Sequence, residues 1–208
     1  ALQREQLAAW FRAVCAITNP VVSAYLQGLL LTGARRTEWQ LLKWGDVDLK
    51  GQKLTIRDKV EGQRIVPLTP YIASLLRGLP RVSEYVFSSE SSKAGHFVGV
   101  SKPHVQACAA ADLPHVSLHG LRRSFATLSE WLEIPVGVVA QIQGHKPSAI
   151  AEKHYKRRPV DLLRMYHERL EGWILEQAGL EWKAEQTVKT PTDVQVSASV
   201  REEVRAPR

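Results

Sequence analysis

The stretch His119-Gly120-Leu121-Arg122-Arg123-Ser124-Phe125 says most about the fold of this 208-residue chain. A helix brings residues three positions apart onto one face, so His119 and Arg122 are expected to point the same way. Such a pair suits a phosphodiester, because the guanidinium can bind two non-bridging oxygens while the imidazole exchanges a proton near neutral pH. An ordinary helix surface can carry the same pair, so the interpretation depends on the rest of the sequence.

Two other segments carry related chemistry. In Leu31-Thr32-Gly33-Ala34-Arg35-Arg36-Thr37-Glu38, a glycine ends one apolar helix and an arginine opens the next. Glu38 follows Arg35 at the i,i+3 spacing, which lets its carboxylate orient the guanidinium. The third segment is Gln143-Gly144-His145-Lys146-Pro147, with Tyr155 ten residues after the histidine. A tyrosine in such a basic run is either a packing residue or a nucleophile.

Together the three segments resemble the catalytic domain of the tyrosine recombinase (phage integrase) family. That family carries an arginine in a Thr-Gly-x-Arg-x-x-Glu segment, a lysine in a β-hairpin, a His-x-x-Arg helix, a Gly-His pair and a tyrosine shortly downstream. All of these features occur here in that order, between about Leu2 and Gln177. The resemblance implies a set of catalytic residues with one supporting carboxylate: Arg35, Lys59, His119, Arg122, His145 and Tyr155, supported by Glu38.

The family breaks and rejoins DNA through a 3′-phosphotyrosyl bond without a metal or a cofactor. The resemblance implies that Tyr155 is the nucleophile and that Arg35 and Arg122 grip the scissile phosphate and stabilise charge on its oxygens. Free tyrosine has a pKa of about 10, so nearby cations are needed to make the phenolate available. His119 would take the proton of the tyrosine, and His145 would hydrogen-bond the phosphate.

The lysine of the set is expected in a hairpin that offers three candidate cations, Arg57, Lys59 and Arg64. Lys59 lies at the turn end of this hairpin, as the lysine of the family does. It is therefore the residue expected to protonate the departing 5′-oxygen as a general acid.

Three features depart from the family pattern. His145 and Tyr155 are one residue further apart than is usual, which indicates a longer loop before the tyrosine. Gln143 replaces a common leucine before the Gly-His pair. Arg123 stands where the family often has a second histidine, at a position that is not catalytic.

The net charge of +7 lies entirely within residues 1–180, because five Lys or Arg balance five acids between 181 and 208. The densest basic run, 153–158, includes the tyrosine, which favours phosphate binding over a merely solvated surface. Double-stranded DNA is therefore the expected partner, and the family acts as tetramers on two duplexes. Candidate contacts to the DNA backbone are Arg36, Arg123, Lys146, Lys156, Arg157 and Arg158.

Apolar periodicity predicts an α+β fold that is predominantly helical, with a small antiparallel sheet near residues 53–68. Residues 1–180 are expected to form the catalytic domain, and 181–208 a flexible or partner-docking tail. Because residue 1 is Ala, we expect a piece of a longer protein. The expected helices cover about 2–17, 21–32, 36–43, 70–77, 99–111, 119–132, 135–141, 147–153 and 159–177, with a further short strand at 85–87. The last helix is spaced to pack either on its own core or on a neighbouring protomer.

The sequence disfavours several other classes of protein. No stretch approaches the ~18 apolar residues of a membrane span, so the sequence predicts a cytoplasmic protein that acts at the nucleoid and has no membrane partner. Scattered acids disfavour a metal-dependent nuclease, and the pair His115 and His119 lacks a third zinc ligand. Two alternatives stay open: a type IB topoisomerase that relaxes supercoils, and a non-catalytic DNA-binding module on the same fold.

Overall fold

A computed structural model describes residues 1–58, 62–145 and 157–182 of the chain. Its first elements are η1 (Arg4–Gln6), α1 (Leu7–Cys15), α2 (Pro20–Thr32), α3 (Arg36–Gln40), η2 (Trp44–Asp46), β1 (Val47–Asp48), β2 (Lys53–Asp58), β3 (Gly62–Pro67) and α4 (Pro70–Arg77). They are followed by α5 (Ser101–Ala110), α6 (Leu118–Ser129), η3 (Glu130–Leu132), α7 (Val136–Gln143) and α9 (Val160–Gln177). The predicted α+β class, predominantly helical with a small antiparallel sheet, is confirmed.

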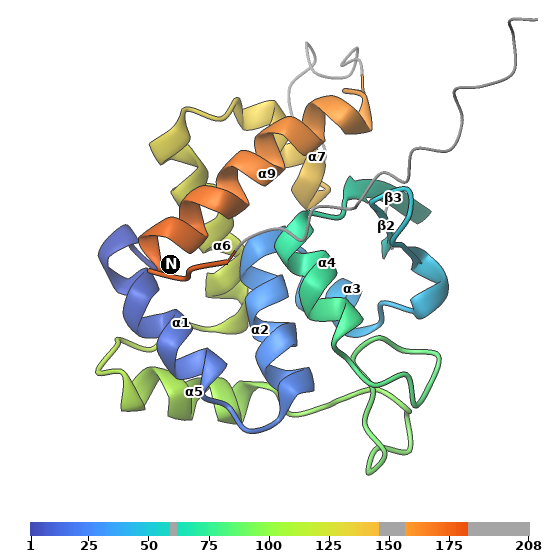
Figure 1. Ribbon diagram of the computed structural model, residues 1–208, viewed down its shortest axis with the longest axis vertical. Helices are drawn as coiled ribbons and strands as arrows, with labels where there is room; N and C mark the ends of the chain where they lie inside the picture. Colours follow the sequence, from blue (N-terminus) through green and yellow to red (C-terminus); the bar gives the residue numbers. More distant parts are fainter. Residues whose placement is uncertain (59–61, 146–156, 183–208) are drawn as a thin grey trace, which may run out of the picture.

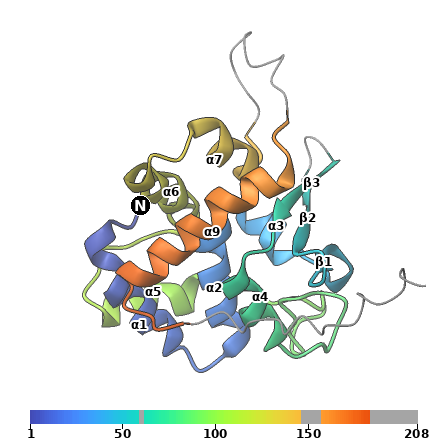
Figure 2. The ribbon, with the colours of Figure 1, turned by 45° about the horizontal axis from the view of Figure 1, so that its top comes forward.

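Helix α2 is the buried centre of the helical part (Figures 1 and 2). Asn19 caps its start by accepting backbone N–H groups, and Pro20 occupies the first turn, where no amide partner is needed. Every residue from Val21 to Thr32 is buried, as expected for a helix that is apolar on all sides. The helix ends at Gly33, whose φ of +58° lies in the left-handed region that glycine tolerates best. This turn leads directly into the Arg35 segment.

The sheet has the strand order β1-β2-β3 and is antiparallel throughout. Its β2–β3 hairpin forms where the sequence predicts it, with Ile56 opposite Arg64. The sequence does not predict the strand β1, because a segment of two residues is too short to show the alternation of apolar and polar residues that marks a strand. Within the hairpin, β2 contacts α3 and β3 contacts α9 (Figure 2). It therefore places a residue of β3 within reach of the Arg35 segment.

Two predicted elements were wrong in detail. Segment 85–87 forms no strand; Tyr85 makes only an isolated antiparallel bridge with Lys43. That bridge holds the chain after α3 in an extended conformation, so the helix ends at Gln40 and not at Lys43. The helix expected at 147–153 falls on residues outside the described part of the chain.

Helix α9 packs on the core of its own chain, which is one of the two arrangements its sequence allowed. Leu163, Leu170 and Ile174 are each at most 1% exposed. Packing continues to the end of the described residues, because the Trp182 ring meets Tyr71 edge-on with centroids 5.4 Å apart. Within the described residues, no helix has the length and apolar character needed to cross a membrane.

Buried polar side chains anchor the same face of α9. His167 Nε2 donates to the Leu31 carbonyl at 2.8 Å, at the C-terminal end of α2. The Glu171 carboxylate accepts hydrogen bonds from the Thr69 hydroxyl and, at 2.8 Å, from the Tyr71 backbone N–H. These contacts connect α9 to the end of α2 and to the first turn of α4.

Candidate active site

Arg35 lies at the N-terminus of α3, just after the left-handed turn at Gly33. Its Nη1 donates to Glu38 Oε1 at 2.5 Å, and its Nη2 donates to the Gly144 carbonyl at 3.0 Å. The Arg35 backbone N–H also donates to Glu38 Oε2 at 3.0 Å. The contact predicted from the i,i+3 spacing is thus present, and Glu38 holds both the main chain and the side chain of the arginine. The Arg35 side chain remains 37% exposed.

Arg122 reaches the same place from α6 and is 5% exposed. Its Nη1 donates to the Gly33 carbonyl at 2.5 Å, and its Nη2 donates to His145 Nε2 at 2.8 Å. Its own backbone carbonyl accepts from Gln143 Nε2 at 2.8 Å. Burial and the neighbouring charge of Arg35 lower the pKa of Arg122 to about 10. The guanidinium is therefore still charged at neutral pH, in a place where a nearby anion would stabilise it.

His145 follows Gly144, the left-handed residue that ends α7. A guanidinium can only donate, so His145 Nε2 is the acceptor in its contact with Arg122, and the ring carries its proton on Nδ1. Burial, followed by the charges of Arg122 and Arg35, lowers the pKa of His145. The imidazole is thus neutral at physiological pH and can donate a hydrogen bond from Nδ1.

Glu38 is shared between two arginines. Its Oε2 accepts from Arg64 Nη2 at 2.7 Å, and the side chains of Glu38 and Arg64 are each 6% exposed. Burial alone would raise the pKa of Glu38, but the hydrogen bonds from Arg64 and Arg35 outweigh it and lower that pKa. The carboxylate therefore stays ionised. Its charge is set against three guanidinium groups, which leaves an excess of two positive charges at the site.

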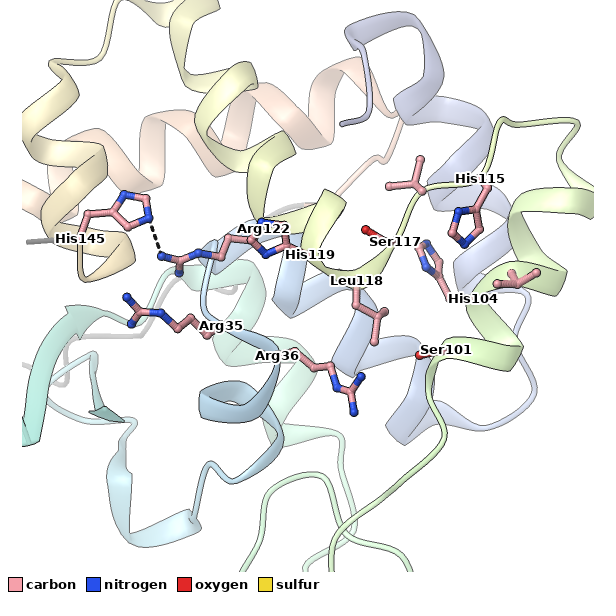
Figure 3. A pocket seen from close by; sticks show the side chains of 12 residues that line it. Arg35, Arg36, Ser101, His104, His115, Ser117, Leu118, His119, Arg122 and His145 are labelled. Atoms are coloured by element: carbon pink, nitrogen blue, oxygen red, sulfur yellow. Dashed lines mark hydrogen bonds between the residues drawn. The ribbon is translucent and has the colours of Figure 1, made fainter. Parts of the chain in front are cut away.

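Arg35, Arg122 and His145 lie at one end of a cleft of about 590 Å³, shown in Figure 3. His119 lines the cleft on the same face of α6 as Arg122, as their spacing predicts, and Arg36 lines it from α3. The imidazole of His119 is exposed to the cleft. Helix α5 and the loop before α6 form the opposite end through Ser101, His104, Val105, His115 and Ser117.

A second hollow of about 560 Å³ shares Arg35 with the cleft and extends to the hairpin. Arg57 lines it and donates to Asp46 Oδ1 at 2.8 Å. Two of the three candidate cations of the hairpin are therefore already engaged, Arg57 with Asp46 and Arg64 with Glu38. Lys59, the third cation, lies outside the described residues.

Four residues of the predicted site lie outside the described part of the chain: Lys59, Lys146, Tyr155 and Lys156. On both sides of 146–156 the chain is held by α7. The His145 N–H donates to the Ala140 carbonyl at 2.8 Å. The Gln141 side chain bonds the backbone N–H and the carbonyl of Arg158, each at 3.0 Å. The other predicted DNA contacts are exposed or partly exposed: Arg36, Arg123, Arg157 and Arg158.

A comparison with protein families matches residues 2–159 to the model described as the phage integrase family. The chain belongs to this family. It is 56% identical to Prophage integrase IntF of Escherichia coli (strain K12) over 189 residues, which cover 88% of this chain and 40% of that protein. The chain thus spans less than half the length of this integrase.

Solved structures of integrases and recombinases share the fold. The integrase from mycobacterium phage Brujita superposes with a TM-score of 0.64 at 21% identity, over 80% of this chain and 60% of that one. The XerH site-specific recombinase bound to its difH substrate, in a pre-cleavage complex, gives a TM-score of 0.59 at 23% identity, over 82% and 51%. The expected tyrosine recombinase catalytic-domain fold is confirmed.

Two residues of this integrase-family site were missed as site residues in the sequence. Arg64 was considered only as an alternative to Lys59, yet it alternates with buried Val66 on the inward face of β3. This alternation was the sequence signal that places Arg64 on the inward face of the strand. A cation on an inward face needs a buried anion as its partner. Gln143 was noted only as a departure from leucine, but its amide holds the main chain of Arg122. The only sequence signal for a role of Gln143 was that a polar side chain stands in the last turn of the apolar helix α7.

Proposed function

We propose that this chain is the catalytic domain of a tyrosine site-specific recombinase, which cuts and rejoins double-stranded DNA through a 3′-phosphotyrosyl intermediate without a metal ion. The observation that carries the proposal is the meeting of Arg35, Arg122 and His145 at one end of the cleft (Figure 3). These three residues come from three different helix regions. The positive charge of the two arginines exceeds the negative charge of Glu38, the carboxylate beside them. Such an arrangement suits a phosphoryl group on which negative charge accumulates.

Arg35 and Arg122 would bind the non-bridging oxygens of the scissile phosphate. Each guanidinium has five N–H donors, of which its contacts with described residues use two. The remaining donors suit a bidentate contact with phosphate. One well-aimed donor of this kind is typically worth about 3 kcal/mol of transition-state stabilisation. Two arginines, with the Nδ1–H of His145, would then supply much of what a metal ion otherwise does.

Tyr155 is the proposed nucleophile. It comes three residues before Arg158 in the sequence, and the main chain of Arg158 is held by Gln141. Attack of the phenolate oxygen on phosphorus forms the phosphotyrosyl ester and releases the 5′-oxygen. His119 would accept the phenol proton, and Lys59 would protonate the leaving oxygen. A 5′-hydroxyl of another strand reverses these steps, so no nucleotide hydrolysis is needed.

The partner in this proposal is double-stranded DNA at the nucleoid. The backbone contacts would come from Arg36, Arg123, Lys146, Lys156, Arg157 and Arg158. The chain spans 40% of the E. coli integrase, so recognition of a target site would also need a further region of a longer protein. By family resemblance, that protein would act as a tetramer on two duplexes. Contacts made by charge alone would weaken steeply with salt.

The test is covalent capture on a nicked suicide substrate that carries the recombination site, identified by sequencing junctions made by the full-length protein. Tyr155→Phe should bind this DNA as wild type does but form no covalent adduct, because the nucleophilic oxygen is lost. Tyr166→Phe is the matched control, since Tyr166 packs against the core from α9. An adduct that persists in Tyr155→Phe would refute the assignment of the nucleophile.

The same substrate separates the remaining alternatives. Wild type that binds DNA but never forms an adduct would favour the non-catalytic module. Relaxation of supercoiled plasmid without strand exchange would favour a type IB topoisomerase. Cleavage that stops in EDTA would indicate a metal-dependent nuclease.

A further inference from the structure

Arg64 is a buried cation that the proposed chemistry does not use. It lies on the inward face of β3, and its side chain is 6% exposed. Its Nη2 donates to Glu38 Oε2 at 2.7 Å, and its Nε donates to the Ile142 carbonyl at 3.2 Å. One guanidinium thus joins the hairpin to the carboxylate on α3 and to the last turn of α7. A guanidinium buried to this extent costs free energy unless its hydrogen bonds are made, so the burial of Arg64 depends on Glu38 and the Ile142 carbonyl.

Gly144 lies directly against this guanidinium. A Cβ at position 144 would be 2.7 Å from Arg64 Cζ and from Nη1, closer than real side-chain contacts come. The φ of +70° at Gly144 independently favours glycine. Arg64 therefore packs closely against the turn at the end of α7 that carries the Gly144 carbonyl.

Both groups that orient the Arg35 guanidinium are consequently held by Arg64. Glu38 binds the Arg35 guanidinium through Oε1, while its Oε2 accepts from Arg64 and from the Arg35 backbone N–H. Arg64 therefore helps to keep Oε2 from turning toward the guanidinium of Arg35 in a two-pronged contact. The Gly144 carbonyl, which accepts from Arg35 at 3.0 Å, lies on the turn that packs against Arg64. We infer that Arg64 is a positioning residue: it aims Arg35 at the scissile phosphate and keeps donors of Arg35 from being consumed by Glu38.

This inference rests on the proposed function and makes a prediction that simple structural support does not. Because Arg64 and Glu38 act on the same guanidinium, removing both should slow the reaction by less than the product of the two single losses. If Arg64 only stabilised the fold, the losses of rate in the two single variants would multiply in the double variant. DNA binding should hardly change, because Arg64 is buried and lies behind Arg35 and not on the surface of the cleft.

The experiment measures single-turnover adduct formation on the suicide substrate, together with DNA affinity and thermal unfolding. Arg64→Gln should slow adduct formation by about tenfold or more, the range for losing a buried charge-assisted hydrogen bond. Its affinity for DNA should stay close to that of wild type. Arg64→Lys keeps the charge and should recover part of the rate. The pair Arg64→Gln with Glu38→Gln should lose less rate than the product of the two single losses.

Arg164→Gln is the matched control. Arg164 also contacts one carboxylate, Asp161, and one backbone carbonyl, that of Gly51, but it lies on α9. It should leave the rate of adduct formation unchanged. An unchanged rate in Arg64→Gln, or losses that multiply in the double variant, would overturn the inference while the proposed function stands.

Absence of any adduct in wild type would instead overturn the proposed function. Crystal structures of wild type and Arg64→Gln would still decide the inference, because they do not depend on cleavage. We expect the Arg35 contact with the Gly144 carbonyl to be lost in the variant. Its retention would show that Arg64 does not position Arg35.

Discussion

Glu38 and Glu171 are two glutamates whose side chains are almost out of contact with water, in clusters of different kinds. Glu38 accepts from the guanidinium groups of Arg35 and Arg64, and its pKa lies below the ordinary value. Glu171 accepts from neutral donors, the Thr69 hydroxyl and the N–H groups of Tyr71 and Ile72. Burial outweighs these hydrogen bonds and raises the pKa of Glu171 to about 7.

The histidines of the two regions do not differ in this way, because the pKa of each is lowered and both are neutral at physiological pH. His145 lies exposed in the cation cluster and accepts from Arg122. His167 is fully buried on α9, and desolvation is the main reason why its pKa falls to about 4. Ionised groups persist where an opposite charge is in direct contact, and burial favours the neutral form elsewhere. The first cluster is therefore suited to bind an anion, and the second to hold α9 against α2 and α4.

The largest effect is expected from removing a cation from the first cluster. Arg122→Gln should slow adduct formation by about 10²–10³-fold, the loss typical for one donor that stabilises a developing oxyanion. DNA affinity should change far less, because many other contacts carry it. Single-turnover cleavage and a binding titration on the same substrate check both points. A proportional loss of affinity and rate would mean that Arg122 binds the ground state equally well.

The second cluster should control stability instead, through Glu171. Its folded pKa of about 7 lies above the ordinary 4.5, so the folded state binds protons more tightly, and stability falls as pH rises through this window. Between pH 5 and 8 the free energy of unfolding should drop by about 2–3 kcal/mol from this group alone. Glu171→Gln keeps an acceptor without the charge and should remove that part of the slope. Urea unfolding of both proteins at the two pH values measures it, and parallel slopes would contradict the assignment.

Much of the candidate site could be predicted from sequence because its members lie in short, regular segments. Glu38 contacts Arg35 at the i,i+3 spacing, and His119 and Arg122 share one helix face, so helix geometry alone relates each pair. The Gly-His pair likewise follows from a helix that ends in a left-handed residue. What brings these segments together is the buried helix α2 and the turn at Gly33, whose apolar pattern is plain in the sequence.

The contacts that sequence could not supply are those between distant segments. Arg64 is 26 residues from Glu38 and 78 from Ile142, and no local period relates such positions. The isolated bridge between Lys43 and Tyr85 has the same character. It ends α3 early and takes the place of the strand expected at 85–87. The residue types at 85–87 favour a strand, but in the fold this segment pairs through a single β-bridge.

His167 provides the opposite pH dependence within the second cluster. Its folded pKa of about 4 lies below the ordinary 6.5, so the unfolded chain takes up the proton first, and stability falls as pH drops below 6.5. Between pH 7.5 and 5 this group should cost the folded state about 2 kcal/mol. His167→Gln retains an N–H donor for the Leu31 carbonyl and should flatten the acid side of the profile. Unfolding measured at both pH values tests this, and an unchanged acid slope would show that another group is responsible.

The smallest effect is expected for a carboxylate that pairs with a cation in open solvent. Glu84 contacts Lys43 at 2.8 Å, as close as the pairs around Glu38, but its side chain is 60% exposed and that of Lys43 is 39% exposed. Water solvates both charges and salt screens them, so the pair contributes little. Glu84→Gln should leave the unfolding midpoint unchanged within error at low and high salt. A drop in the unfolding midpoint as large as the drop in Glu38→Gln would mean that contact distance, and not burial, determines how much an ion pair stabilises this chain.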